Sequence, residues 1–314
     1  MPQSLPTGIV SSPEIERPMK EYGKDAVERI NNEIATLIPT INDDFRKLCA
    51  YVMDPDNTDP EKASRTRSIL AYVAGDTFGV ERDQVDEFAL SVELIHNSSL
   101  ILDDLPSQDN SRTRRGKDAF WVKFGESDTH LTSIGMQQLA GGLVAKVDSE
   151  NNLQSNLTRF VADSIGFNGM CRGQMKDLET FGTDPEGITI EKLDQIAHDK
   201  TSKAIALGVI GVAIICKVEP EVIEILEEYC YHTGIAYQVL DDVADATNTE
   251  EQTGKTVGLD AENGKPTYID ILGEKGAHAK AKSHADKALD AIERLPRKYN
   301  PRKLQEVVDM VSDR

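Results

Sequence analysis

The chain has 314 residues, with 54 Asp and Glu against 35 Lys and Arg, and its formal net charge at pH 7 is −19. This charge argues against nucleic acid or an anionic membrane surface as the main partner, so local Lys and Arg side chains or metal ions would have to bind any anionic substrate. No apolar run reaches the roughly 18 residues of a membrane span. The four cysteines form no CxxC pair, which favours inert thiols in a reducing, cytoplasmic location.

Apolar residues recur at steps of three and four along almost the whole chain, as is typical of amphipathic helices. No segment alternates convincingly as a strand. The predicted helices cover approximately residues 21–37, 41–52, 62–78, 91–103, 131–147, 153–181, 190 onward, 204–215, 220–245, 277–295 and 301 onward. The sequence therefore predicts an all-α protein with one domain over residues 21–314, a helical bundle around a central cavity, after a flexible segment of residues 1–20.

The predicted helix that begins near Ser91 ends in two carboxylates, Asp103 and Asp104. They meet the negative end of the helix dipole, which is unfavourable by roughly 0.3–1 kcal/mol unless a cation offsets it. Pro106 ends the helix, so Asp109 can turn back toward the pair. Oxygen ligands of this kind suit Mg²⁺, which often shares its coordination shell with substrate phosphates. The alternative for this segment alone is an acidic helix end in a solvated turn.

Basic side chains flank this acidic helix end. Arg114 and Arg115 follow it, and their forked donors fit phosphate oxygens. Lys62 and Arg65 lie one turn apart at or near a helix start, a position that favours anions, although a solvated basic patch is the alternative. His96 lies two turns before Asp103 on the same helix face, where a satisfied core histidine is the simpler interpretation.

A second acidic helix end occurs in the segment YQVLDDVAD, where Asp241 and Asp245 share a face and Asp242 lies beside them. Polar and basic residues elsewhere accompany it: Gln174, Asp177, Lys200, Thr201, Gln238, Lys255 and Lys265. Two acidic helix ends attended by Lys and Arg indicate a pocket in which several Mg²⁺ ions hold a diphosphate. The diphosphate becomes a leaving group once the metals and Lys200 withdraw electron density, and an allylic carbon tolerates the resulting positive charge.

The runs ELIHNSSLILDDLPSQD, RRG, GQMKDL, KTSKA, YQVLDDVAD, GKTVGLD and NGKPTY, in this order and spacing, resemble the trans-isoprenyl diphosphate synthases. The resemblance implies the isoprenoid synthase type of helical bundle, three Mg²⁺ ions with a bound diphosphate, and a homodimer. It implies condensation of isopentenyl diphosphate with an allylic diphosphate (dimethylallyl, geranyl or farnesyl) by ionisation, condensation and elimination.

The same resemblance assigns roles to matched positions. The metal ligands would be Asp103, Asp104, Asp109, Asp241, Asp242 and Asp245. Binding of the allylic diphosphate falls to Arg114, Lys200 and Lys255, with Lys265 as a further substrate-binding residue. Binding of isopentenyl diphosphate falls to Lys62, Arg65, His96 and Arg115. The oxygens of Thr201 and Gln238 would face the developing cation, so with Lys200 they form the expected catalytic group.

Product length in this family depends on side chains below the first acidic motif. Ser99 and Ser98 precede Asp103 by one turn and slightly more, and both are small. We therefore expect geranylgeranyl diphosphate as the favoured product, with farnesyl diphosphate next. The alternatives are a class I terpene cyclase, which needs no second substrate, and a non-catalytic subunit of a heteromeric synthase, which would be expected to have lost an Asp cluster.

Overall fold

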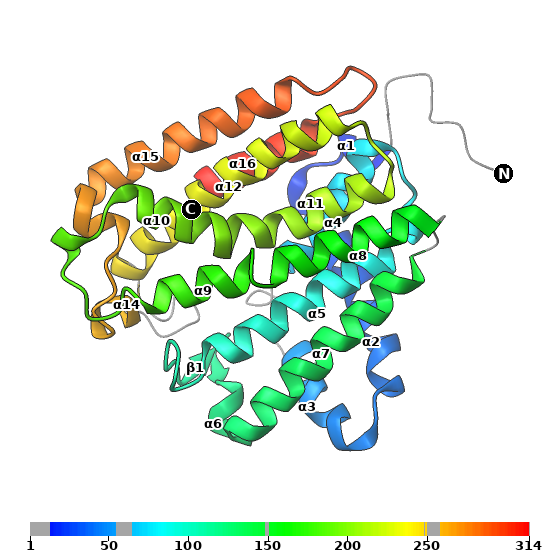
Figure 1. Ribbon diagram of the computed structural model, residues 1–314. Coiled ribbons are helices and arrows are strands. Elements are labelled where there is room, and N and C mark those ends of the chain that lie inside the picture. Colours follow the sequence, from blue (N-terminus) through cyan, green and yellow to red (C-terminus); the bar gives the residue numbers. More distant parts are fainter. Residues whose placement is uncertain (1–12, 55–64, 148–150, 248, 250–257, 314) are drawn as a thin grey trace.

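The computed structural model describes residues 13–54, 65–147, 151–247, 249 and 258–313, and over these residues the protein is a bundle of helices (Figure 1). The main helices are α1 (Pro13–Glu16), α2 (Met19–Leu37), α3 (Asp43–Met53), α4 (Thr66–Phe78), α5 (Asp86–Asp103), α6 (Phe120–Phe124), α7 (Glu126–Lys146), α8 (Asn151–Ile165), α9 (Met170–Leu178), α10 (Ile190–Ala197), α11 (Lys203–Ile215), α12 (Pro220–Thr247), α14 (Leu259–Glu262), α15 (Tyr268–Glu293) and α16 (Arg302–Ser312). Short 3₁₀ turns are η1 (Ile38–Thr40), η3 (Arg82–Gln84) and η4 (Pro185–Gly187), and η5 (His198–Ser202) is a π-helix. The all-α prediction is confirmed.

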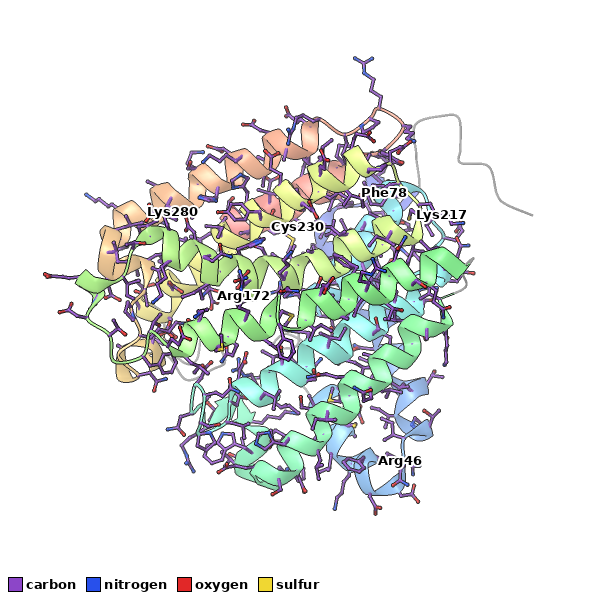
Figure 2. The ribbon with its side chains drawn as sticks, in the orientation of Figure 1. Arg46, Phe78, Arg172, Lys217, Cys230 and Lys280 are labelled. Carbon is purple, nitrogen blue, oxygen red and sulfur yellow. The ribbon has the colours of Figure 1, made fainter. Side chains whose placement is uncertain are left out.

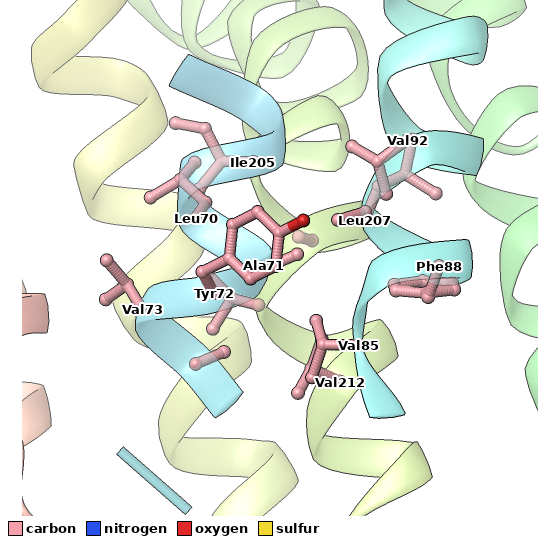
Figure 3. Packing of buried hydrophobic residues seen from close by; sticks show 14 of the residues in the cluster. Leu70, Ala71, Tyr72, Val73, Val85, Phe88, Val92, Ile205, Leu207 and Val212 are labelled. Carbon is pink, nitrogen blue, oxygen red and sulfur yellow. The ribbon is translucent and has the colours of Figure 1, made fainter. Parts of the chain in front are cut away.

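The centre of the bundle is formed by α4, α5 and α11. Helix α11 is apolar around its whole circumference, as expected of a helix buried on all sides. Figure 3 shows its side chains Ile205, Leu207 and Val212 among those of α4 and α5. Gly211 lets α5 approach, because a Cβ there would lie 2.1 Å from Cζ of Phe88. Around this centre α12 packs on α15, and α5 packs on α7.

The predicted helix over residues 153–181 is in fact two helices. Helix α8 ends at Ile165, and α9 begins at Met170. Between them Gly169 has φ −138° and ψ −128°, and a Cβ there would lie 1.9 Å from the carbonyl oxygen of Ser164. Apolar periodicity continues through this break, so the sequence pattern alone does not reveal it.

Three further differences concern the ends and faces of elements. Residues 13–16 of the expected flexible segment form α1, which buries Ile15 completely. Leu131 and Ile134 belong to α7 as predicted but are 54% and 57% exposed. The last long helix begins at Tyr268 rather than near Ala277, because Thr267 caps it, and it kinks at Gly273. Among the described residues, no helix combines the length and apolarity that crossing a bilayer requires.

Candidate active site

The first acidic cluster lies where α5 ends. The chain turns back after Pro106, and the backbone N–H of Asp109 donates to the carbonyl oxygen of Asp103 at 2.9 Å. Burial raises the pKa of Asp103 to about 6, and the nearby charge of Asp109 adds to the rise. Asp104 is fully buried and accepts from Nε of Arg114 at 3.1 Å and 3.2 Å. The loop thus returns Asp109 to Asp103, as expected from Pro106.

The three carboxylates do not converge on one point as the sequence reasoning expects. Arg114 holds Asp104 through both oxygens. Within the part of the chain that the structure describes, no three His, Cys, Asp or Glu side chains lie close enough together to hold a metal ion. The assignment of these aspartates as metal ligands therefore stays a prediction.

A short hairpin directs the side chains of the two consecutive arginines, Arg114 and Arg115, to different places. Strand β1 (Thr113–Arg114) pairs antiparallel with β2 (Lys117–Asp118), with Arg114 opposite Lys117. The turn is Arg115-Gly116, and φ is positive at both residues, +54° and +75°, as a type I′ turn requires. Arg114 turns to the acidic cluster, whereas Nη1 of Arg115 donates to Oδ1 of Asn97 at 3.0 Å. The motif RRG therefore supplies two different sites.

Arg115 lies in a strongly basic region with His96 and Arg67. Burial lowers the pKa of His96 to about 3, and the charges of Arg67 and Arg115 lower it further, so this imidazole is neutral at pH 7. Arg67 also lies over the ring of Tyr237, at 5.3 Å from the centroid. Arg67 was expected on the basic face beside Lys62 and Arg65 but was assigned no role in the site. Its signal was present, since Arg67 is the second arginine of the segment SRTRS.

Arg65, which the sequence reasoning placed at this basic site, is 2% exposed and points into the core. Its guanidinium donates to Oε1 of Glu93 at 2.9 Å, to Oδ1 of Asn31 at 3.1 Å and to the carbonyl oxygen of Met53. The reason is local: α4 begins only at Thr66, and Arg65 has φ +49°. Arg65 therefore does not continue the face of α4, and its direct contact with substrate stays an untested prediction.

Lys200 and Thr201 lie on the π-helix η5, a widened turn between α10 and α11 that is frequent at functional sites. Helix α9 packs closely on it, because a Cβ at Gly173 would lie 2.4 Å from the backbone nitrogen of Lys200. Arg172, labelled in Figure 2, ties the two segments by an ion pair with Asp199 at 2.7 Å. The position of Lys200 is thus set by a close backbone contact and a salt bridge.

The second acidic cluster lies near the end of α12. Thr201 donates from Oγ1 to Oε1 of Gln238 at 2.7 Å, and Nε2 of Gln238 donates to Oδ1 of Asp242 at 2.9 Å. Burial raises the pKa of Asp242 to about 7. Asp245 accepts from the backbone N–H of Gly258 at 3.2 Å, and Asp241 is half-buried on the same helix. The structure thus links both predicted cation-facing groups to this cluster.

Two lysines share one aspartate between the clusters. Oδ2 of Asp177 lies 2.9 Å from Nζ of Lys200 and 3.3 Å from Nζ of Lys265. Burial opposes ionisation of Asp177, but the two lysines outweigh it and lower its pKa to about 2. Burial likewise disfavours the charge on Lys265, yet Asp177 and acidic groups from both clusters, Asp242 and Asp109, raise its pKa.

Lys265 therefore interacts with acidic groups of both clusters, and Lys200 with those of the first. The ends of α5 and α12, the hairpin and α14 gather at one end of the bundle (Figure 1). Asn263, in the segment after α14, donates from Nδ2 to the carbonyl oxygen of Asp109 at 3.1 Å and so links the first cluster to the segment that carries Lys265. Lys62 and Lys255 lie outside the described residues.

Comparison with known proteins identifies the class. The polyprenyl synthetase family matches residues 56–311, so the chain belongs to this family. It is 32% identical over 248 residues to the farnesyl diphosphate synthase of Haemophilus influenzae, covering 78% of this chain and 83% of that protein. It is 34% identical over 256 residues to geranylgeranyl pyrophosphate synthase 4 of Arabidopsis thaliana, covering 81% and 67%. The protein is thus a prenyltransferase of the farnesyl and geranylgeranyl diphosphate synthase group.

Solved structures agree on the fold. A geranyltransferase from Helicobacter pylori, in complex with magnesium and isoprenyl diphosphate, superimposes with a TM-score of 0.79 at 24% identity, covering 97% of this chain and 98% of that one. An FPP/GFPP synthase from Zymomonas mobilis gives a TM-score of 0.77 at 23% identity, covering 94% and 97%. The all-α bundle is therefore the isoprenyl synthase fold.

Proposed function

We propose that the protein condenses isopentenyl diphosphate with an allylic diphosphate in a Mg²⁺-dependent reaction, and that geranylgeranyl diphosphate is its favoured product, with farnesyl diphosphate next. The observation that carries the proposal is that Lys265 interacts with both aspartate clusters, while Lys200, which shares Asp177 with it, interacts with the first. Such a site presents oxygen ligands for divalent cations on two sides of fixed positive charges. A diphosphate bridged by those cations fits between them.

The donor set fits magnesium. All six predicted ligands are carboxylates, the oxygen donors that Mg²⁺ prefers. The pKa values of Asp103 and Asp242 are raised by burial to about 6 and about 7, so the protein's own cations do not fully compensate these two groups. Bound Mg²⁺ would neutralise the aspartates and withdraw electron density from the allylic diphosphate, which promotes departure of pyrophosphate.

The chain's own residues divide the remaining work. Lys200 and Arg114 bind the allylic diphosphate, with Lys255 and Lys265. Arg115 and His96 bind isopentenyl diphosphate with Lys62, and Arg67 takes a place beside them that we had expected for Arg65. Neutral His96 donates one N–H to phosphate without adding to the repulsion among the arginines.

Thr201 and Gln238 turn oxygen atoms toward the carbocation that remains when pyrophosphate leaves. The double bond of isopentenyl diphosphate then attacks that cation, forming the new C–C bond. The released pyrophosphate accepts the proton that is lost in the final elimination, so the reaction needs no protein base. The hydrogen bond between Thr201 and Gln238 fixes the direction of both side chains.

Incubation with isopentenyl diphosphate, each allylic starter and Mg²⁺, followed by analysis of product chain length, tests this proposal. We expect elongated linear diphosphates and consumption of isopentenyl diphosphate, which a terpene cyclase would leave untouched. Asp103→Ala and Asp241→Ala should each slow condensation by at least a hundredfold. Asp290→Ala is the matched control, because Asp290 is an exposed aspartate on α15 far along the chain from both clusters, and it should not slow condensation. Near-normal turnover in either cluster variant would refute the metal assignment.

The choice of geranylgeranyl diphosphate rests on Ser98 and Ser99. Both hydroxyls donate to carbonyl oxygens of α5 itself, Ser98 to Ile95 at 2.7 Å and Ser99 to His96 at 2.9 Å, so neither side chain extends from the helix. Small side chains at these two positions would leave more space below the first acidic cluster for a longer tail than an aromatic residue would. Ser98→Phe and Ser99→Phe should shorten the main product by one or more isoprene units. An unchanged distribution in both variants would show that other residues set the length.

The proposed homodimer is supported by the exposed face of α7. Leu131 and Ile134 are more than half exposed on it, and residues 131–145 contain no charged side chain. Depletion of charge around exposed apolar residues is typical of the centre of a protein interface. We expect light scattering to report a dimer, and Ile134→Lys to shift it toward monomer. A monomeric wild-type protein would refute this assignment.

A further inference from the structure

A continuous chain of hydrogen bonds leads from the core to Arg115. Oε1 of Glu93 accepts from Arg65 at 2.9 Å and from Nδ2 of Asn97 at 2.8 Å, and its Oε2 accepts from Ser68 at 2.6 Å. Asn97 then uses Oδ1 to accept from Nη1 of Arg115 at 3.0 Å. Arg65, Glu93 and Asn97 are all at most 2% exposed. Every partner between the core and Arg115 is thus fixed.

Arg115 needs such support because its own backbone is strained. It is the first central residue of a type I′ turn and has φ +54°, which costs a residue other than glycine about 1 kcal/mol or more. A turn residue is poorly fixed by its neighbours along the chain. The side chain is therefore held mainly by what it contacts, and Asn97 is the partner that α5 provides.

The charges around this chain leave room for an anion. Glu93 stays ionised, because the charges of Arg65 and Arg115, together with the hydrogen bond from Ser68, outweigh its burial and lower its pKa to about 2. Arg65 forms the ion pair with this negative charge, at 2.9 Å. Arg115 carries a second positive charge, and burial lowers its pKa. Within the described residues Arg115 has a hydrogen bond to the neutral amide of Asn97 but no ion pair, so an incoming diphosphate would find a guanidinium without a carboxylate partner there.

We propose that Asn97 and Glu93 are positioning residues that hold Arg115 for the diphosphate of isopentenyl diphosphate, and that Arg65 supports Arg115 through Glu93. This inference rests on the proposed function, which places that substrate beside Arg115. This role would explain the ion pair between Arg65 and Glu93, because the pair fixes Glu93, and through Asn97 it fixes Arg115. A buried ion pair is by itself a poor source of stability, and apolar residues of similar size often replace one without loss.

The experiment measures binding of inorganic pyrophosphate by calorimetry in EDTA, so that it depends neither on turnover nor on metal. Asn97→Leu keeps the size of the side chain but removes the acceptor for Arg115. We expect its dissociation constant to rise about tenfold, the factor that loss of one hydrogen bond to a charged group implies. Arg115→Ala should weaken binding at least as much, and adding Asn97→Leu to Arg115→Ala should weaken it no further.

Ser91→Ala is the matched control, because Ser91 is a buried hydroxyl on α5 that donates only to Phe88 of the same helix, at 2.7 Å. It should leave pyrophosphate binding unchanged. Ser68→Ala removes one donor to Glu93 and serves as a milder second variant if Asn97→Leu folds poorly; we expect a smaller rise in the same direction. The inference would be overturned if Asn97→Leu weakened binding as much in the Arg115→Ala background as in the wild type. Unchanged binding in both Asn97→Leu and Ser68→Ala would also overturn it.

Steady-state kinetics then separate this inference from the proposed function. In an active enzyme, Asn97→Leu should raise KM for isopentenyl diphosphate about tenfold and change KM for the allylic substrate and kcat less than about threefold. A wild-type protein that elongates nothing would refute the proposed function while the pyrophosphate coupling still stands. Normal elongation with equal effects on both KM values would refute the positioning role alone.

Discussion

The close contact between α9 and the π-helix makes Gly173→Ala a sharp test of how Lys200 is positioned. The new Cβ would lie 2.4 Å from the backbone nitrogen of Lys200 and 2.8 Å from the carbonyl carbon of Asp199. Both are backbone atoms, so no side-chain rotation relieves the overlap, and the two segments must separate by about 1 Å to restore ordinary van der Waals contact.

The expected stability change is the difference of two opposing effects. Alanine is preferred over glycine inside a helix by about 1 kcal/mol. Overpacking costs about 1–3 kcal/mol, and contact with rigid backbone places Gly173→Ala at the upper end of that range. The net loss of unfolding free energy should be about 1–2 kcal/mol. A displacement of Lys200 by about 1 Å should also lower kcat on the order of a hundredfold.

Urea unfolding and steady-state kinetics measure both effects, and Gly23→Ala on α2 is the control. No atom lies within 4 Å of a Cβ at Gly23, so this variant should gain up to about 1 kcal/mol and keep its activity. If Gly173→Ala were as stable and as active as Gly23→Ala, the close packing of α9 on the π-helix would not be what fixes Lys200.

Two further predictions concern buried charge. Asp177→Asn removes the anion shared by Lys200 and Lys265, so it should cost about 2–3 kcal/mol of stability, less than a fully buried pair because Lys200 is 25% exposed. Pyrophosphate should stabilise this variant more than the wild type, and equal shifts in the urea midpoint would contradict the reasoning. His284 lies 3.0 Å from His232, Nδ1 to Nδ1, and burial lowers the pKa of His284 to about 4. Between pH 4 and 6.5 this histidine binds a proton more readily in the unfolded chain, where its pKa is near 6.5, than in the folded protein. Stability should therefore fall as the pH drops through that range, and this group should have no effect on stability above it. His284→Phe should weaken this pH dependence, and an unchanged slope would refute the assignment.

The sequence was informative wherever a local pattern determines structure. The steps of three and four residues located most helices, the predicted end of a helix at residue 78 is the end of α4, and the acidic ends of α5 and α12 are where the motifs placed them. Each of these features depends on residues within a turn or two of one another, which a linear reading contains.

The remaining features depend on packing between distant segments. The break before Gly169 and the π-helix that carries Lys200 interrupt no apolar period, so the pattern gives no sign of them. Arg65 and Arg67 are two residues apart and alike in chemistry. Only the start of α4 at Thr66 decides that the first enters the core and the second joins His96. Two-residue strands are also too short for alternation to reveal.

The hairpin that carries Arg114 and Arg115 has a consequence for the geometry of the proposed reaction. The Cα atoms of consecutive residues stay about 3.8 Å apart across a trans peptide. In the proposed reaction Arg114 binds the allylic diphosphate, the electrophile, and Arg115 binds isopentenyl diphosphate, the nucleophile. The two residues that would hold the electrophile and the nucleophile are then joined by one peptide bond, so a movement of the hairpin relative to the surrounding helices would shift both binding groups together.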